Sequence, residues 1–150
     1  MFKKVYFVRT SENAKPPAYA HDGDKGADLY SIENVIISPG DRATINTGIR
    51  LGLPPGHAGF VVSRSGLASK HGISVLNSPG LIDTFYHGDI KVILHNSNHM
   101  PYTIEIGDRI AQLVIVQLND FNFEDIVSSD TFETLFKSDR GVKGFGSSGK

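Results

Sequence analysis

The chain contains no cysteine among its 150 residues. Disulfide scaffolds, thiol catalysis and thiolate metal sites are therefore excluded. It also has no run close to the roughly 20 apolar residues that a membrane span needs. The two lysines near the start, in Met1–Val5, precede no long apolar stretch. We therefore expect a soluble cytoplasmic protein.

An excess of charge of one sign is also missing, because 15 basic residues stand against 16 acidic ones and the net charge is -1. Proteins that coat nucleic acid usually carry a basic excess, so this class is disfavoured. The length predicts a single domain, residues 1–150, large enough to bury a core without disulfides or metal.

Long helical patterns are absent, because 16 glycines and 7 prolines interrupt the chain at short intervals. Short, β-branched apolar runs separated by turn signals predict an all-β fold of the sandwich, jelly-roll or barrel type. The predicted strands are Val5–Val8, Val35–Ser38, Ala43–Leu53, Ala58–Val62, Ile73–Leu76, Asp89–Asn96 and Ile110–Leu118. Short helices are expected at Ser65–His71 and Thr131–Lys137, and a mobile arm at Ser138–Lys150.

Ile110–Val116 barely alternates between apolar and polar residues. Such a strand is covered on both faces, here by a second sheet and by a partner subunit. Gln112 interrupts this run, and a lone amide in a buried strand must find hydrogen-bond partners. Asp28 lies between small and apolar residues, and by itself it indicates only a turn at a strand end.

Arg64, Ser65 and Gly66 open the first predicted helix. Free backbone N–H groups and an arginine fork favour an anion at this point. The alternative is structural: Ser65 caps the helix, Gly66 makes the turn and Arg64 is a surface residue.

The segment Asn77–Lys91 lies between two predicted strands and indicates a hairpin or tight corner. Asp83, beside apolar Leu81 and Ile82, can serve as a base. Tyr86 offers a flat face for packing against a sugar or base. Alternatively, Asp83 only starts a turn and Tyr86 belongs to the core.

The C-terminal stretch Gly144–Gly149 matches the dinucleotide pattern G-x-G-x-x-G, but only Lys150 follows it. The pattern is meaningful only between a strand and a helix, so this interpretation is rejected. The tail from Arg140 to Gly149 still offers Arg140, Lys143, two hydroxyls, backbone amides and Phe145. These groups suit a polyphosphate and a flat ring, although a plain disordered tail is the alternative. The six histidines show no metal-binding spacing.

Taken together and in order, these segments resemble the five motifs of the trimeric dUTPase family from Gly26 to Gly149. The matching stretches are 26–31, 64–73, 77–96, 107–114 and 140–149. The resemblance implies a jelly-roll-like subunit of the dUTPase β-clip type and a homotrimer with active sites built from more than one subunit. It also implies Mg²⁺-dependent hydrolysis of dUTP to dUMP and pyrophosphate, which keeps uracil out of DNA and supplies dUMP for thymidylate synthesis. No dedicated metal ligands are expected, since the substrate phosphates and water hold Mg²⁺.

The resemblance also assigns roles to single residues. Asp83 activates the water that attacks the α-phosphorus, and Gln112 helps to place that water or the phosphates. Asn77 and backbone groups of the corner bind the uracil edge, while Tyr86 packs under the deoxyribose and excludes a 2′-hydroxyl. Asp28 organises the site and helps to position the arginine of the tail.

For the triphosphate, the resemblance implies that Arg64, Ser65 and Gly66 bind it, with Ser65 near the α–β bridge. Arg140 closes over the γ-phosphate, and Phe145 covers the uracil ring. The other substrate-binding residues implied by the motifs are Gly80, Ile82, Lys91, Gly146, Ser147 and Ser148.

Four residues depart from the usual motifs. Ser63 stands where proline is common, and Phe85 where a small or acidic residue is usual. His87 replaces a frequent arginine, and Lys143 a frequent glycine. None of these changes removes a reacting group.

Three other functions remain as alternatives. A dCTP deaminase would share the fold but needs a carboxylate, usually glutamate, placed at C4 of cytosine, whereas the corner carries Asp83. A non-catalytic dUTP sensor would not need a base at that position. An unrelated β-sandwich module would not keep five nucleotide motifs in order.

Overall fold

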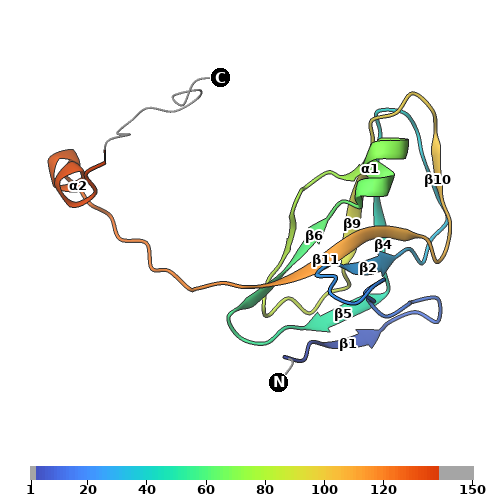
Figure 1. The fold of residues 1–150 in the computed structure, drawn as a ribbon, viewed down its shortest axis with the longest axis horizontal. Coiled ribbons are helices and arrows are strands. Elements are labelled where there is room, and N and C mark those ends of the chain that lie inside the picture. The colour runs from blue at the N-terminus through green and yellow to red at the C-terminus, as the bar shows by residue number, and fades with distance from the viewer. Residues whose placement is uncertain (1–2, 139–150) are drawn as a thin grey trace. The chain divides into compact units, whose positions relative to one another are not determined.

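The computed structural model describes residues 3–138. The chain divides into two compact units, residues 1–119 and 120–150. In the described part of the first unit, every regular element except α1 is a strand (Figure 1), which confirms the all-β expectation. Its elements are β1 (Tyr6–Arg9), β2 (Ala27–Tyr30), β3 (Val35–Ile37), β4 (Arg42–Asn46), β5 (Ile49–Gly52), β6 (His57–Val62), α1 (Ser65–His71), β7 (Ile73–Val75), β8 (Gly80–Ile82), β9 (Lys91–Asn96), β10 (Tyr102–Ile104) and β11 (Arg109–Gln117).

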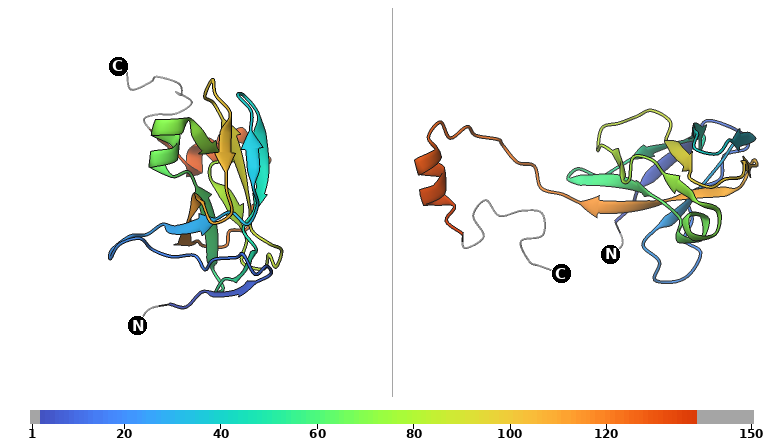
Figure 2. Two further views of the ribbon diagram at one scale, coloured as in Figure 1. Left: turned by 90° about the vertical axis from the view of Figure 1, so that its right-hand side faces the viewer. Right: turned by 90° about the horizontal axis from the view of Figure 1, so that it is seen from above.

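All the strand pairings are antiparallel. The larger sheet has the order β2-β11-β6-β8, and a three-stranded sheet has the order β4-β9-β7. Two-stranded ribbons, β1-β5 and β3-β10, complete the unit. Figures 1 and 2 show the long β11 crossing the middle of this arrangement, with β2 and β6 on its two sides. Neighbours in each sheet are distant in sequence, as in a jelly-roll-like fold.

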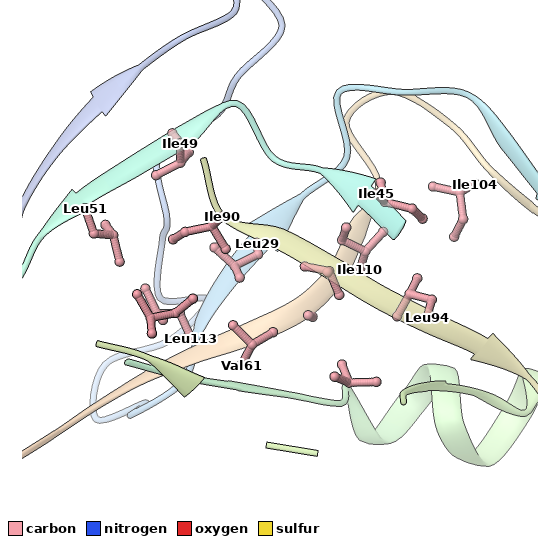
Figure 3. Close-up of a cluster of buried hydrophobic side chains, with 14 of the residues drawn as sticks. Leu29, Ile45, Ile49, Leu51, Val61, Ile90, Leu94, Ile104, Ile110 and Leu113 are labelled. Atoms are coloured by element: carbon pink, nitrogen blue, oxygen red, sulfur yellow. The ribbon is translucent and has the colours of Figure 1, made fainter. Parts of the chain in front are cut away.

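The core lies where the apolar faces of these sheets meet (Figure 3). Ile45, Val92 and Leu94 of the three-stranded sheet are at most 1% exposed, and Leu29 and Ile110 of the larger sheet are 1% exposed. Ile110 and Ala111 are both buried, but the register between β11 and β2 shifts between Arg109 and Ala111. Beyond this irregularity Ala111 and Leu113 are buried while Gln112 and Val114 are half-buried, so coverage of both faces stays a prediction. Farther along β11, Val114, Ile115 and Val116 are only half-buried in the single chain.

The prediction of one continuous strand over Ala43–Leu53 is wrong. The chain breaks into β4 and β5, which join different sheets. The break falls at Gly48, whose φ of 65° favours glycine, while Thr47 Oγ1 donates to the Ile90 carbonyl over 2.8 Å. A side chain at Gly48 would also meet the Ala14 Cβ at 2.9 Å. The turn therefore depends on glycine. The β-branched residues on both sides of Gly48 had instead predicted a continuous strand.

The helix α1 has the predicted bounds and ends where Gly72 takes a left-handed φ of 66°. The idea that Ser65 caps it is wrong, since Arg64 occupies the cap position without a side-chain cap bond. The segment Asn77–Lys91 forms a corner between sheets, because β8 pairs with β6 while β9 pairs with β4 and β7. The short strands β2, β8 and β10 were not among those predicted.

The second unit contains α2 (Ser129–Leu135), which begins and ends two residues earlier than the predicted helix. Ser128 sets this start, because its hydroxyl accepts a bond from the Thr131 N–H. The rings of Phe132 and Phe136 lie 5.0 Å apart. Across residues 3–138, no helix is long and apolar enough to cross a membrane.

Candidate functional site

The corner after β7 encloses a cavity of about 180 Å³. It lies between the β8 corner, β9 and Val61 of β6. Six residues singled out from the sequence line it: Asn77, Gly80, Ile82, Asp83, Tyr86 and Lys91. The others are Val61, Leu81, Asp89, Val92 and Ile93. The cavity thus combines apolar walls with an amide, two carboxylates, a phenol and an amine, which is the usual make-up of a small-molecule site.

Asp83 follows the last residue of β8, where the buried Ile82 ends the strand. Its carbonyl accepts a bond from the Tyr86 N–H over 3.1 Å, which closes a tight turn. The Asp83 side chain is exposed in the single chain. A carboxylate at this position is free to contact a water molecule at the cavity mouth.

Tyr86 is 45% exposed and is held by its polar end. Its hydroxyl donates to the Asp89 carbonyl over 3.2 Å. The ring lies directly on the Gly88 backbone, because a Cβ at Gly88 would overlap the hydroxyl and lie 2.5 Å from Cζ. The hydroxyl is therefore engaged within the loop, and the ring is the part of Tyr86 that remains available to a ligand.

A second cluster gathers around Asp28, which is 3% exposed in the middle of β2. Its Oδ1 lies 3.3 Å from Arg64 Nε and accepts a bond from Gln112 Nε2 over 3.4 Å. Its Oδ2 lies 3.5 Å from Arg109 Nη1. One buried carboxylate therefore orients two guanidinium groups and one amide. The absence of a side chain at Gly26 matters here, because a Cβ would press on Gln112 at 3.2 Å.

Arg109 is the functional candidate that the sequence did not single out. Besides its contact with Asp28, its carbonyl accepts a bond from Arg64 Nη1 over 3.0 Å. Its position three residues before Gln112, in the same motif, was the available signal. The pairing of Arg109 with Asp28 could not be predicted from the sequence, because 81 residues separate them.

The two arginines line a second cavity, of about 170 Å³. Leu67, Tyr102, Ile104 and Asp108 complete its wall. Burial raises the pKa of Tyr102 above its usual value, and nearby Asp108 raises it further, while Arg64 acts in the opposite direction. Asp28 and Asp108 together offset the charge of the two guanidinium groups. The N–H groups of Arg64 and Arg109 remain as a fork of donors that suits an anion.

The chain that leads into Arg64 is fixed by Ser63, one of the four departures from the motifs. Its hydroxyl accepts a bond from the Val75 N–H over 2.8 Å and so ties the end of β6 to β7. Proline, which is common at this position in the motif, has no side-chain acceptor to offer. The substitution therefore has a structural role here.

The two clusters lie far apart within one chain. β2 and β8 are the opposite edges of the four-stranded sheet, so three strand spacings, about 14 Å, separate them. Gln112 lies beside Val62, whereas Ile82 lies beside Gly59, which adds about 10 Å along the strands. Asp28 and the Asp83 corner are therefore roughly 17 Å apart by this geometry, and the two cavities share no lining residue.

Ser65 and Gly66 begin α1, next to the second cluster, and both are exposed. The tail candidates Arg140, Phe145, Gly146, Ser147 and Ser148 lie outside the described residues. Among residues 3–138, no group of three or more histidine or acidic side chains is placed to hold a metal ion.

Comparison with known proteins points to one family. A sequence model described as dUTPase matches residues 12–149. The chain is 48% identical over 134 residues to a deoxyuridine 5'-triphosphate nucleotidohydrolase of Leifsonia xyli subsp. xyli, covering 89% of this chain and 84% of that protein. It is also 48% identical over 147 residues to the protein of the same name in Thermobifida fusca, covering 97% and 79%.

The similar solved structures are also dUTPases. A mutant dUTPase of Staphylococcus bacteriophage 80alpha with dUpNHpp matches with a TM-score of 0.89 and 30% identity, over 99% of this chain and 100% of that one. A mutant dUTPase from phage phi11 of S. aureus, described with a structural Mg(II) ion, matches with a TM-score of 0.78 and 27% identity, over 85% and 99%.

Proposed function

The chain belongs to the dUTPase family, and from this premise we propose that it hydrolyses dUTP to dUMP and pyrophosphate by attack of water on the α-phosphorus. The observation that carries the proposal is the first cavity, which is lined by all six residues expected from the third motif. The same reaction would remove dUTP before uracil enters DNA and would supply dUMP for thymidylate synthesis.

The size of this cavity supports a division of the substrate between two places. At about 180 Å³ it is smaller than the 300 Å³ or more of a site that encloses a whole drug-sized ligand. We assign it the uracil and deoxyribose, with Asn77 at the edge of the base and Tyr86 under the sugar. The triphosphate would then extend towards guanidinium donors.

These donors belong to the Asp28 cluster, where Arg64 and Arg109 line the second cavity. Ser65 and Gly66 follow Arg64 and would add a hydroxyl and backbone N–H groups. Gln112, held by Asp28, would position the attacking water or a phosphate oxygen. Fixed donors of this kind stabilise the charge that develops on the leaving pyrophosphate, because they need little reorganisation during the reaction.

Since these clusters are roughly 17 Å apart within one chain by the strand geometry, we propose that Asp83 of one subunit acts with Arg64 and Gln112 of another in a homotrimer. The half-buried Val114, Ile115 and Val116 on β11 are available to such a contact. The tail residues Arg140, Phe145, Gly146, Ser147 and Ser148 would close over the phosphates and the base as a mobile arm, so the whole chain would act as one functional domain.

Mixing two inactive variants tests the shared site. Asp83→Asn and Arg64→Ala are each expected to be inactive alone. Unfolding and refolding them together should restore activity, since some sites then combine an intact Asp83 with an intact Arg64. Each variant unfolded and refolded alone is the control. If both residues act within one subunit, every site in the mixture stays defective and no activity returns.

Mg²⁺ is the proposed cofactor. Carboxylate and phosphate oxygens suit this ion, and it usually keeps several waters while bound to substrate phosphates. Asp28 is already engaged by two arginines, so the triphosphate itself would supply most ligands. Bound Mg²⁺ would neutralise phosphate charge and so improve pyrophosphate as a leaving group. Chelation should stop turnover, and added Mg²⁺ should restore it.

The decisive measurement is pyrophosphate release from dUTP with Mg²⁺, beside dCTP, dTTP and UTP. Fast release from dUTP alone is the expected result. No release by the folded protein would contradict the proposal, and ammonia release from dCTP would then identify a deaminase rather than a nucleotide sensor. The cytoplasmic location is a separate prediction, which cell fractionation would test.

A further inference from the structure

The loop Thr84–Asp89, which carries Tyr86, has little apolar burial to hold it. Phe85 is 82% exposed and Tyr86 is 45% exposed, and His87 is exposed as well. A segment with few buried contacts moves easily unless specific bonds fix it. The position of the Tyr86 ring therefore depends on the bonds at the two ends of the loop.

At the first end, Thr84 Oγ1 donates to the His57 carbonyl over 2.6 Å. At the other end, the Asp89 carboxylate is held by two residues that lie outside the five motifs. Arg50 Nε, on β5, lies 2.6 Å from Oδ1, and Thr10 Oγ1 donates to Oδ2 over 3.0 Å. Arg50 lies within the β1-β5 ribbon, and Thr10 is the first residue after β1. The Arg50 guanidinium holds the pKa of the Asp89 carboxyl below its usual value.

The backbone of Asp89 connects this anchor directly to Tyr86. The Asp89 carbonyl accepts a hydrogen bond from the Tyr86 hydroxyl over 3.2 Å, and the tyrosine ring rests on Gly88, the residue before Asp89. Any movement of the Asp89 backbone therefore moves the atom that fixes the tyrosine. Arg50 itself does not line the first cavity.

We propose that Arg50 and Thr10 are positioning residues that, through Asp89, fix the Tyr86 ring and so set the discrimination between 2′-deoxyribose and ribose. The inference rests on the proposed function, in which Tyr86 lies under the sugar. A fixed ring leaves no space for a 2′-hydroxyl. When the bonds from Arg50 and Thr10 to Asp89 are removed, the loop becomes more mobile and the Tyr86 ring can move aside. The ribonucleotide then binds more easily.

The test compares Arg50→Met, which keeps much of the side-chain length, with the wild type. The measured quantity is the ratio of kcat/KM for UTP to that for dUTP. Since the Arg50–Asp89 pair is partly exposed, with side chains 52% and 28% exposed, we expect a rise in this ratio of about 2- to 5-fold. Thr10→Val should raise it in the same direction, and Arg50→Lys should stay nearer to the wild type. Arg42→Met, on the exposed part of β4, is the matched control and should not change it.

A double-mutant cycle separates positioning from general weakening of the fold. In a Tyr86→Ala background the ring is absent, so Arg50→Met should no longer change the ratio. An equal effect of Arg50→Met in both backgrounds, or no effect in either, would overturn the proposal. The melting temperature should fall by no more than a few degrees, because exposed ion pairs contribute little to stability.

Calorimetric titration with dUMP and UMP measures the same discrimination without turnover. If the wild type prefers dUMP but releases no pyrophosphate from dUTP, the proposed function fails while the positioning role is still judged from the binding ratio of the variants. If dUTP is hydrolysed and Arg50→Met leaves both ratios unchanged, the proposed function stands and the role of Arg50 is refuted.

Discussion

Asp28 and Gln112 lie opposite each other on β2 and β11, and the Gln112 amide donates to the Asp28 carboxylate over 3.4 Å. The same carboxylate contacts Arg64 and Arg109. Because Asp28 is buried and its two arginine partners line a cavity, we infer that it orients the groups proposed to bind the phosphates. In this proposal its contribution to the reaction is indirect.

Removing the charge of Asp28 should therefore weaken substrate binding more than it slows the chemical step. Asp28→Asn keeps the shape but weakens charge-assisted bonds, each worth about 1.5–3 kcal/mol. We expect kcat/KM for dUTP to fall roughly 10- to 100-fold, with a clear loss of melting temperature. Asp22→Asn, in the exposed loop before β2, is the control and should behave as wild type. Unchanged kcat/KM in Asp28→Asn would show that Arg64 and Gln112 are positioned without it.

The sequence predicted the parts of the fold that depend on local patterns. The helix Ser65–His71 was placed correctly because Gly72 stops it after two turns. The strand pattern of β6, β9 and β11 was recognised from alternating or continuous apolar residues. The break at Gly48 was missed, since one glycine within a β-branched run gives a weak signal, and the packing against Ala14 that requires it is a tertiary contact.

The site was predictable only in part, for a related reason. Asp83 and Tyr86 come from one continuous corner, so their neighbourhood could be inferred from adjacent residues. Asp28, Arg64 and Arg109 meet only because β2, β6 and β11 are neighbours in one sheet, and no local pattern encodes that order. The resemblance named Asp28 and Arg64 but gave no sign that Asp28 pairs with Arg109.

Asp83→Asn tests the proposed base. The amide has almost the same shape, so the chain should fold and bind dUTP, but it cannot take a proton from water. We expect kcat to fall roughly 10² to 10⁴-fold, with little change in the dissociation constant measured by calorimetry. Near-normal turnover would remove Asp83 from this role. A loss of nucleotide binding would point instead to a structural function.

Gly88→Ala tests the contact beneath Tyr86. The added methyl group would overlap the tyrosine hydroxyl, so the ring must move out of its position. We expect a folded protein with a higher KM for dUTP and poorer rejection of UTP. Gly52→Ala is the matched control, since a Cβ added there would lie 3.7 Å from the Tyr6 Cβ, an ordinary contact distance. Equal selectivity in the two variants would argue against a role for the Tyr86 position.

Truncation before Arg140 tests the proposed closing arm. The chain 1–139 keeps every described strand and helix, so it should fold and assemble as the full chain does, as gel filtration would show. Loss of Arg140 and Phe145 removes the charge and the ring expected to cover the substrate, so dUTP turnover should nearly vanish. Removal of Lys150 alone is the control. An active 1–139 chain would refute the arm.

Tyr102→Phe tests whether the tyrosine beside the second cavity limits stability at high pH. Burial raises its pKa in the folded chain, so the unfolded state releases this proton first. Stability supplied by the neutral phenol is thus present below the ordinary pKa of about 10 and declines as the pH rises through the folded value. The phenylalanine variant cannot ionise.

The measurement for Tyr102→Phe is the change in melting temperature between pH 9 and pH 11. The wild type should lose more than the variant over this interval. Tyr6→Phe controls for the loss of a hydroxyl as such, because Tyr6 is 69% exposed on β1, and it should follow the wild type. Parallel losses in all three proteins would mean that another group controls the alkaline decline. A smaller loss in Tyr102→Phe alone would show that the phenol remains neutral beside Asp108 in the folded protein, and that ionising it works against folding.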